Sequence, residues 1–579
     1  MTQVNDGSDT TVVIVRRSRR AVLRGIAVAG ATSALGALLA ACGGSTTTAT
    51  NTPKPAATTG ASGTTAPAAT SAPAASASGQ TGAAPSPSTP AAGAPKKGGT
   101  LRAANNLEVA TLDPLTSGFG AEREIYYNMY DSLVAIDTEL KIIPALAEKW
   151  EIPDPKTYIF SLRKDVKFHD GTDFNAEAVK WNLDRYLTDK TSRRASEISS
   201  IQTMEITDPY TLKITLKAPF VPFLANLVDR AGMMLSPKAV QAGGADFSRK
   251  PAGAGTGPFM FVEWITNDHL TMERNPNYWK KDASGTQLPY LDKVIFRPIT
   301  DETVLLTNLK TGDLDAYWLV PPKDVASIKS GKELVLREAP GLNFYCFEFN
   351  TQTEPFNKKE LRQAVAEALD REQINKTVYF GTYQVGYGPI PPSSWAYDPN
   401  LKPYTGNVAR AKEYLKAGGK PDGFAFEYKL AAGSPTALQL LQLVKDQLAK
   451  AGIILNISQQ EAAKIQADAQ AGNFQSTSYN WSGRIDPDGN IFNQLHTGGS
   501  LSETKYSNSQ VDDLLDKART TTDQSQRKEF YQQAQKIMVN DAPMAWWGFA
   551  PAYLLTRPNV QGMQVYADFM MRFHEAWLK

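Results

Sequence analysis

Short segments in which apolar and polar residues alternate predict β-strands in several parts of the chain. In residues 158–163, three large apolar side chains occupy every second position. A period of two is typical of a half-buried strand. The preceding sequence PDPK at 153–156 predicts a tight turn, because proline fixes φ and aspartate bonds to its own backbone. Residues 211–216 and 343–350 show similar alternation and are also expected to form strands.

Other segments have the spacing of amphipathic helices. A helix is expected to open near Asn175, with apolar side chains on one side as far as Leu187. Ser434-Pro435 is typical of a helix start, and Gly452 is typical of the residue that follows a helix. From about residue 341 onward, strands and helices alternate, which is typical of a separate α/β lobe.

Length and composition narrow the class of protein. With 579 residues, the chain is long enough for three or four domains of roughly 150 residues each. The net charge of +2 argues against a surface dedicated to nucleic acid. The two cysteines, Cys42 and Cys346, provide no disulfide framework. Cys346 lies in an apolar strand, so we expect a buried small side chain rather than a reactive thiol.

The most specific pattern occupies residues 143–181, IPALAEKWEIPDPKTYIFSLRKDVKFHDGTDFNAEAVKW, and it predicts a strand, a turn, a strand and a helix. This stretch resembles the bacterial solute-binding proteins of family 5, which serve oligopeptide, dipeptide and nickel ABC importers. Those proteins carry P-x-LAE-x-W-E, then Y-x-F-x-LR-x-x-V-x-FHDG, then an A-E-x-V-K helix. The match is dense and ordered over about forty residues.

Further landmarks of the family follow in the same order. They are GTGPF at 255–259, RNPNYW at 274–279 and YSNSQVDDLL at 506–515. The glycine-rich loop at 253–257 is not expected to bind phosphate, because no Lys-Ser or Lys-Thr follows and Pro258 blocks a P-loop helix. A tight crossover between domains is the expected role. The resemblance therefore covers the chain from about Gly99 to Lys579.

This resemblance implies an α/β, periplasmic binding protein-like two-lobed fold (type II, cluster C) with an extra subdomain on the first lobe. The expected boundaries are lobe I at 99–132, 253–340 and 545–579, subdomain II at 133–252, and lobe III at 341–544.

The N-terminal part has the features of an export signal. SRRAVLR at 18–24 fits a twin-arginine pattern, and the following apolar stretch is too short and too rich in small residues for a stable membrane span of ~20 residues. It ends in LAAC, which resembles a lipobox, so we expect cleavage before Cys42 and lipidation of its sulfur. Cleavage nearby as an ordinary secretory signal is the alternative. Residues 43–98 are rich in Ala, Thr, Pro and Ser and are expected to form a disordered linker.

Catalytic and metal-binding motifs do not stand out. The chain has four histidines and shows no HExxH, CxxC, GxSxG or Walker A sequence. His169 is expected to make a local hydrogen bond. We therefore expect no enzyme activity, no cofactor and no metal site.

The strongest candidate for contact with a solute is 479–490, YNWSGRIDPDGN. In peptide-binding relatives an aromatic residue and a Gly-Asp pair occur here, and that Asp binds the N-terminal ammonium of the peptide. This chain has Gly483-Arg484 instead, and a planar guanidinium favours a carboxylate, phosphate or hydroxyl-rich group. The alternatives are that Arg484 pairs with Asp486 or Asp488, or that it faces solvent.

A tryptophan beside a glycine-rich loop is expected to wall a cleft, although core packing is the alternative for Trp481. The candidate ligand-binding residues are Tyr479, Asn480, Trp481, Gly483, Arg484 and Asp486, and the weaker candidates, for which a structural role is the alternative, are Ser117, Phe119, Asn343, Tyr345, Tyr387 and Trp395.

The resemblance implies a monomeric extracytoplasmic protein, held at the outer face of the cytoplasmic membrane by lipid on Cys42. It would capture a peptide or peptide-like solute between two lobes and deliver it to the permease of an ABC importer. A ligand-sensing receptor for a signalling partner is one alternative, and an oligosaccharide or another acidic or polyhydroxylated solute is another. A bare nickel ion is not expected, because no His/Cys cluster occurs.

Overall fold

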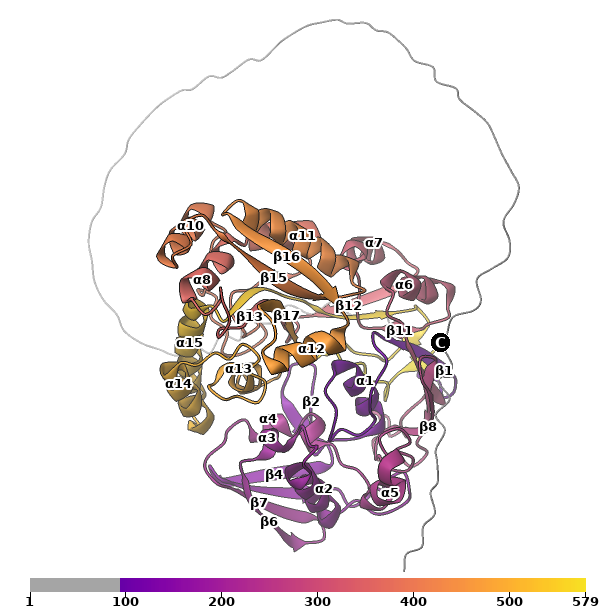
Figure 1. Ribbon diagram of the computed structural model, residues 1–579. Coiled ribbons are helices and arrows are strands. Elements are labelled where there is room, and N and C mark those ends of the chain that lie inside the picture. The colour runs from indigo at the N-terminus through magenta and orange to yellow at the C-terminus, as the bar shows by residue number, and fades with distance from the viewer. Residues whose placement is uncertain (1–93) are drawn as a thin grey trace, which may run out of the picture. The chain divides into compact units, whose positions relative to one another are not determined.

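Three β-sheets organise residues 94–579, which are the residues that the computed structural model describes (Figure 1). The predicted export signal, Cys42 and most of the predicted linker lie outside the described residues. Among residues 94–579, no helix has both the length and the apolar character needed to cross a membrane.

The seven-stranded sheet contains both early and late parts of the chain. Its central strand β1 runs parallel to β10 and β11, and the other pairs are antiparallel. The order is β12 (Val335–Ala339), β19 (Ala552–Thr556), β11 (Ala316–Tyr317), β1 (Thr100–Asn105), β10 (Lys293–Pro298), β9 (His269–Arg274) and β8 (Phe259–Ile265). The elements associated with it are α1 (Gly120–Met129), α6 (Glu302–Thr311), η3 (Pro322–Asp324), α7 (Val325–Ser330), β20 (Val560–Gln561) and β21 (Trp577–Leu578).

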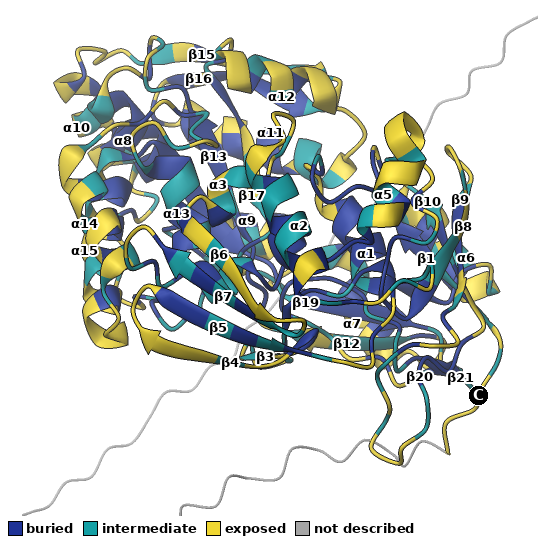
Figure 2. Cartoon of the chain, turned by 90° about the horizontal axis from the view of Figure 1, so that it is seen from below, coloured by how far each residue is buried: buried dark blue, intermediate teal, exposed yellow. Residues whose placement is uncertain are grey.

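The four-stranded sheet is antiparallel throughout, with the order β4 (Ala147–Asp154), β5 (Thr157–Leu162), β7 (Thr211–Leu216) and β6 (Ile201–Asp208). The predicted alternation in β5 and β7 is confirmed, since both central strands bury every second side chain while the edge strands are largely exposed (Figure 2). Its neighbours are β2 (Val134–Ile136), β3 (Ile142–Pro144), α2 (Ala176–Thr188), α3 (Ala195–Ile198), α4 (Phe223–Asn226), η1 (Arg230–Gly232), α5 (Pro237–Gly243) and η2 (Gly244–Asp246).

The helix predicted near Asn175 is α2. The Asn175 side chain accepts a hydrogen bond from the amide of Ala178, which satisfies one of the free N–H groups at the helix start. The local hydrogen bond expected for His169, just upstream, is replaced by one to a distant part of the chain, since its Nε2 lies 2.9 Å from the carbonyl oxygen of Gly257. Burial lowers the pKa of His169 to about 4, so the ring is neutral at neutral pH.

The six-stranded sheet carries the largest apolar core. Its order is β14 (Gln384–Val385), β18 (Met544–Phe549), β13 (Phe344–Phe349), β17 (Ser476–Trp481), β15 (Phe424–Ala431) and β16 (Ile453–Gln460). The helices that accompany it are α8 (Lys359–Ala368), α9 (Arg371–Val378), α10 (Val408–Ala417), α11 (Pro435–Ala449), α12 (Ala462–Ala471), α13 (Asp488–Leu495), α14 (Ser509–Thr520) and α15 (Gln524–Asp541).

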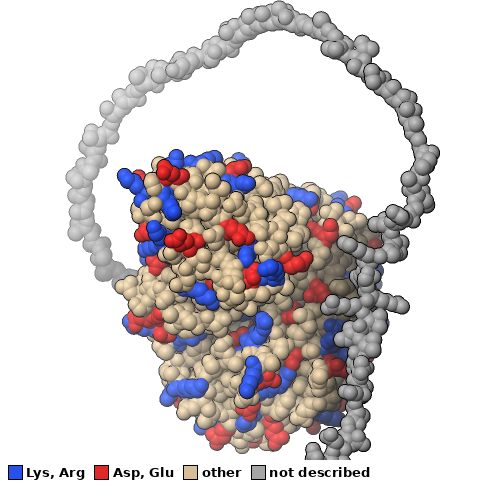
Figure 3. Space-filling model, in the orientation of Figure 1, with Lys and Arg blue, Asp and Glu red and all other residues tan. Residues whose placement is uncertain are grey.

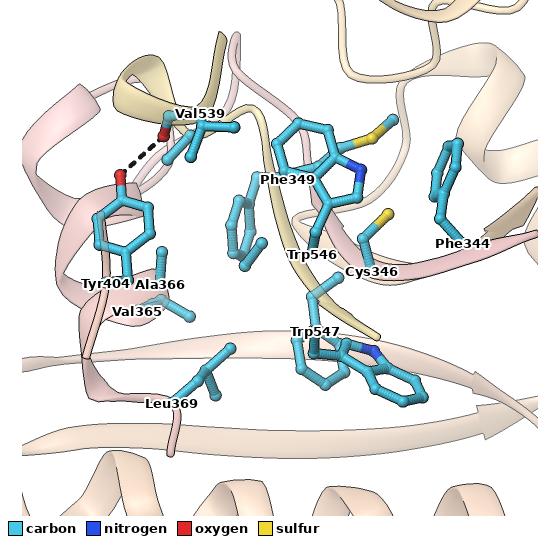
Figure 4. Close-up of a cluster of buried hydrophobic side chains, with 14 of the residues drawn as sticks. Phe344, Cys346, Phe349, Val365, Ala366, Leu369, Tyr404, Val539, Trp546 and Trp547 are labelled. Carbon is cyan, nitrogen blue, oxygen red and sulfur yellow. Dashed lines mark hydrogen bonds between the residues drawn. The ribbon is translucent and has the colours of Figure 1, made fainter. Parts of the chain in front are cut away.

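Large apolar side chains fill the space between this sheet and its helices (Figure 4). Cys346 is buried among them as a free thiol, as predicted, and burial raises its pKa well above its usual value. The hydroxyl of Tyr404 donates a hydrogen bond of 2.8 Å to the carbonyl oxygen of Val539, so this polar group is satisfied inside the core.

The chain passes between the seven-stranded and six-stranded sheets at two places, from β12 to β13 and from β18 to β19. The predicted boundary at residue 545 differs from the second crossing, which lies between Phe549 and Ala552. β18 pairs with β13, and all six of its residues are buried, so Trp546 and Trp547 belong to the six-stranded sheet.

The two crossing segments touch each other at Gly341. A Cβ atom on this residue would lie 2.3 Å from the carbonyl oxygen of Ala550 and 2.7 Å from Cζ of Phe569. Both separations are far below van der Waals contact, so only glycine fits at this point without a shift of the backbone.

We expect Gly341→Ala to lower the free energy of unfolding by about 1–3 kcal/mol through overpacking. Gly120→Ala is the matched control, because a Cβ at this first residue of α1 meets nothing within 4 Å. Denaturant unfolding of both variants measures the difference. Equal stabilities would contradict the close contact between the two crossing segments.

Candidate functional site

A cavity of about 690 Å³ lies where elements of all three sheets meet. One side is formed by the start of α1 with Phe119, and by the segment 192–197 around α3. The opposite side is formed by the end of β17 and the residues that follow it, with α12 and the segment 500–503. Three parts of the fold that are distant in sequence therefore enclose one space.

The end of β17 supplies an aromatic wall. The rings of Tyr479 and Trp481 lie parallel, with centroids 6.2 Å apart. The indole nitrogen of Trp481 donates a hydrogen bond of 3.0 Å to the side-chain oxygen of Asn490 on α13. Since this bond and the stacking fix the ring, Trp481 offers a rigid flat surface to the cavity.

Arg484 lies at the same wall and pairs with neither of the carboxylates considered from the sequence. Asp486 binds Arg527 at 2.9 Å, and Asp488 binds Arg519 at 2.7 Å. Arg484 instead has its guanidinium carbon 4.7 Å from the centre of the Trp481 ring. Its Nη1 donates hydrogen bonds to Ser482 Oγ at 3.2 Å and to the carbonyl oxygen of Gly483 at 2.7 Å.

A buried carboxylate, that of Asp229, lies beside Arg484 without itself lining the cavity. Its Oδ2 lies 3.6 Å from Arg484 Nε, and its Oδ1 accepts a hydrogen bond of 3.1 Å from Arg123 Nε. A third guanidinium, that of Arg230, has its Nε 3.7 Å from Oδ1. Burial opposes ionisation of Asp229, but Arg123, Arg230 and Arg484 outweigh it and hold the pKa of this carboxyl well below its usual value.

Ser117, a weaker candidate, organises the neighbouring arginines. Its hydroxyl donates a hydrogen bond of 2.6 Å to Glu122 and accepts one of 3.0 Å from Arg230 Nη1. Its carbonyl oxygen accepts a hydrogen bond of 3.0 Å from Arg194 Nη2. Ser117 therefore positions two arginines that line the cavity, although it is itself fully buried and does not line it.

A second cavity of about 330 Å³ adjoins the first, and Asn480 borders both. Its wall on the six-stranded sheet is aromatic and contains Tyr345, Tyr379, Tyr383 and Trp547. The Tyr379 and Trp547 rings are stacked with centroids 4.9 Å apart. The two cavities together combine a cationic space with one that has an aromatic wall.

The sequence candidates thus divide into two groups. Phe119, Tyr479, Asn480, Trp481 and Arg484 line the larger cavity, and Tyr345 and Asn480 line the smaller one. The remaining candidates, Ser117 among them, line neither cavity and have structural contacts. Gly483 packs at φ +74 against Leu342, Asp486 pairs with Arg527, Asn343 is buried near Gly341, Tyr387 lies beside Arg371, and Trp395 packs against Tyr531.

Seven charged residues of the site were not among the sequence candidates: Arg123, Arg193, Arg194, Glu197, Arg230 and Glu503, which line the cavity, and Asp229 behind them. The pair Asp229-Arg230 could have been identified from the sequence, because these two charged residues interrupt the apolar run LVDRAGMML at 227–235. Charges inside such a run are buried and need partners. Arg123 and Arg194 carry no comparable local signal.

The described residues show no assembly of metal ligands. Within 94–579, no group of three or more His, Cys, Asp or Glu side chains is placed to hold a metal ion. What the cavity offers is aromatic surface and guanidinium groups, which bind by stacking and by charge-assisted hydrogen bonds.

The chain belongs to the bacterial extracellular solute-binding proteins, family 5, whose profile matches residues 141–502. Members of this family bind peptides or other small solutes and work with the permeases of ABC transporters. The fold is accordingly that of the two-lobed periplasmic binding proteins, as the sequence predicted. The relatives found are binding proteins for transporters and not enzymes.

Particular relatives cover most of the chain. The glutathione-binding protein GsiB of Salmonella choleraesuis is 31% identical over 483 residues, which is 81% of this chain and 92% of the relative. DppA from Helicobacter pylori, solved with the peptide STSA, matches 83% of this chain and 98% of its own at 28% identity and a TM-score of 0.75. AgaA from A. tumefacien R10, solved with agropinic acid, matches 83% of this chain and 99% of its own at 29% identity and a TM-score of 0.74.

We expect Asp229→Asn to lower the free energy of unfolding by about 3 kcal/mol, because it leaves buried guanidinium groups without their carboxylate. The folded-state pKa of Asp229 is depressed, so its contribution is complete above about pH 4 and is lost as the pH falls further. Denaturant unfolding at pH 7 and pH 3 measures this. Asp523→Asn, at the exposed N-cap of α15, is the control for loss of a carboxylate outside the cluster. A stability of Asp229→Asn equal to the wild type at pH 7 would contradict the ion cluster.

Proposed function

We propose that this protein captures a small peptide-like solute in the cavity between its lobes and delivers it to the permease of an ABC importer. The observation that carries the proposal is the aromatic and cationic wall at the end of β17, which faces the residues around α1 and α3 across one enclosed space. A solute held there touches both lobes at once. Its binding free energy therefore favours the arrangement in which the lobes are together.

The size and lining of the cavity support a solute of a few residues. A volume of about 690 Å³ lies within the range of sites for drug-sized molecules, and the adjoining aromatic cavity adds about 330 Å³. Trp481 provides a flat contact for an apolar or planar part of the solute, and Asn480 lies where a longer solute passes from one cavity to the other.

The relatives supply the first compounds to test. GsiB is named for glutathione, an acidic tripeptide, and DppA was solved with a short peptide. The resemblance in sequence implies that Arg484 stands where peptide-binding relatives carry the Asp that pairs with an N-terminal ammonium. We therefore propose glutathione-like acidic peptides, rather than peptides anchored by their amino terminus, as the solute class.

Anchoring at the membrane is part of the same proposal. The sequence LAAC at 39–42 supports lipidation of Cys42. A lipid-anchored receptor stays close to its permease, which raises the rate at which the two meet.

We expect Trp481→Ala to weaken solute binding at least about 10-fold, because buried aromatic contacts dominate such sites. The solute that co-purifies with the wild-type protein, identified by mass spectrometry after unfolding, is the ligand to titrate, with reduced glutathione as the first trial compound. Calorimetry measures the affinities.

Trp264→Ala is the matched control, since Trp264 is also half-buried but lies on β8 against Arg249, away from this cavity. It is expected to bind the solute as the wild type does. Unchanged solute affinity in Trp481→Ala would show that the aromatic wall is not part of the proposed binding site. A wild-type protein that retains no solute and binds neither glutathione nor short peptides would contradict the proposed function.

We expect Cys42→Ala to move the protein from the membrane fraction to the soluble fraction, because the thiol that accepts the lipid is gone. Cys346→Ala is the control, since this cysteine is buried in the core and its loss leaves the anchor intact. Immunoblots of separated membranes measure the distribution. A Cys42→Ala protein that stays with the membrane would contradict lipid anchoring at this residue.

A further inference from the structure

Three arginines at the larger cavity keep hydrogen-bonding capacity that the protein does not use. Arg123 bonds through Nε and Nη1, Arg230 through Nη1, and Arg484 through Nη1. Within residues 94–579, the Nη2 group of none of the three donates a hydrogen bond, although all three side chains line the cavity. Arg123 and Arg230 are more than nine-tenths buried, and Nε of Arg230 is itself buried without a hydrogen-bond partner.

The charge of the cavity wall is also unbalanced. Five arginines and two glutamates line the cavity, and one of the glutamates, Glu197, is already bound to Arg194 at 2.5 Å. Asp229 behind the wall is a single carboxylate that three guanidinium groups share. The wall therefore carries an excess of positive charge even after Asp229 is counted.

This excess is concentrated at the arginines next to Asp229. Burial and the neighbouring Arg194 lower the pKa of Arg230 to about 9, which remains high enough to keep it charged at neutral pH. Buried charges without partners are costly, and their cost falls when an opposite charge arrives. On the face in Figure 3, by contrast, Lys and Arg are interspersed with Asp and Glu.

We propose that Arg123, Arg230 and Arg484 form an oxyanion-binding pole of the cavity, which takes a carboxylate or phosphate group of the solute. The assignment rests on the proposed function, because the pole holds one end of the captured solute. The free Nη2 groups supply the donors, and guanidinium groups match the geometry of an oxyanion. Trp481, in cation–π contact with Arg484, then covers the part of the solute next to its acidic group.

The pole also explains why a single carboxylate sits among three arginines. Asp229 holds the guanidinium groups in place, but it cannot satisfy all of their donors. Full neutralisation of the three arginines by protein carboxylates would leave no attraction for an incoming anion. A partly neutralised cluster is therefore suited both to holding the guanidinium groups in place and to attracting an anionic solute.

The test compares glutarate with glutaramide, which has the same carbon skeleton and no charge. Calorimetric titration uses the full-length protein after its solute has been removed by unfolding and refolding. We expect glutarate to bind at least about 10-fold tighter than glutaramide, as charge-assisted hydrogen bonds exceed neutral ones. Inorganic phosphate is titrated in a separate arm: tighter binding of phosphate identifies a phosphate group as the natural occupant, and tighter binding of glutarate identifies a carboxylate.

Arg484→Gln and Arg230→Gln are each expected to lower the glutarate affinity about 10-fold while the weak affinity for glutaramide stays the same. Arg249→Gln is the matched control, because Arg249 is exposed and lies over Trp264. Circular dichroism shows whether each variant folds. If Arg230→Gln does not fold, the titration of Arg484→Gln with glutarate decides the test, since the Arg484 side chain is partly exposed.

The proposal is overturned if glutarate binds no tighter than glutaramide, including the case in which neither binds. It is also overturned if the preference for glutarate persists in Arg484→Gln. Failure of the proposed function is a different result, since it appears as the absence of any captured solute. A protein that captures a neutral solute and shows no preference for glutarate would retain the function and lose the anion pole.

Discussion

The ion cluster around Asp229 connects the three sheets of the described chain. Asp229 itself lies in the part that surrounds the four-stranded sheet, Arg123 lies on α1 beside the seven-stranded sheet, and Arg484 follows β17 of the six-stranded sheet. Because the cluster is buried, its electrostatic interactions are stronger than those between surface charges. Its geometry fixes how the walls of the larger cavity face each other, so the shape of the site depends on it.

This arrangement links binding to conformation. The two crossings between the large sheets meet at Gly341 and Ala550, which confines the connection between the lobes to one place. A solute in the cavity adds contacts between surfaces that the crossings alone leave free to separate. The free energy of binding then shifts the population toward the closed arrangement, which is the form a permease can distinguish from the empty one.

Local parts of the fold could be predicted from the sequence because their causes are local. The alternation in 157–162, the cap at Asn175 and the Ser434-Pro435 helix start depend on residues close to each other in the chain. The crossing near residue 550 could not be placed, since the apolar residues of β18 indicate burial without indicating which sheet they join.

The candidate site divides in the same way, into parts set by residues close in the sequence and parts set by tertiary packing. The segment that follows Tyr479 could be recognised as a wall because its aromatic residues and glycine are adjacent in sequence. The cluster of Arg123, Asp229 and Arg484 could not, because these residues are brought together only by the packing of three sheets. Asp486 and Asp488 were reasonable partners for Arg484 by distance along the chain, but the neighbouring helices supply Arg527 and Arg519 for them instead.

The central claim is that a solute is held between the lobes and brings them together. The most direct test is small-angle X-ray scattering of the protein with its co-purified solute, after removal of the solute, and after the solute is returned. We expect a larger radius of gyration for the empty protein and recovery of the smaller value on return of the solute. Identical radii for the empty and loaded protein, with binding confirmed by calorimetry, would contradict it.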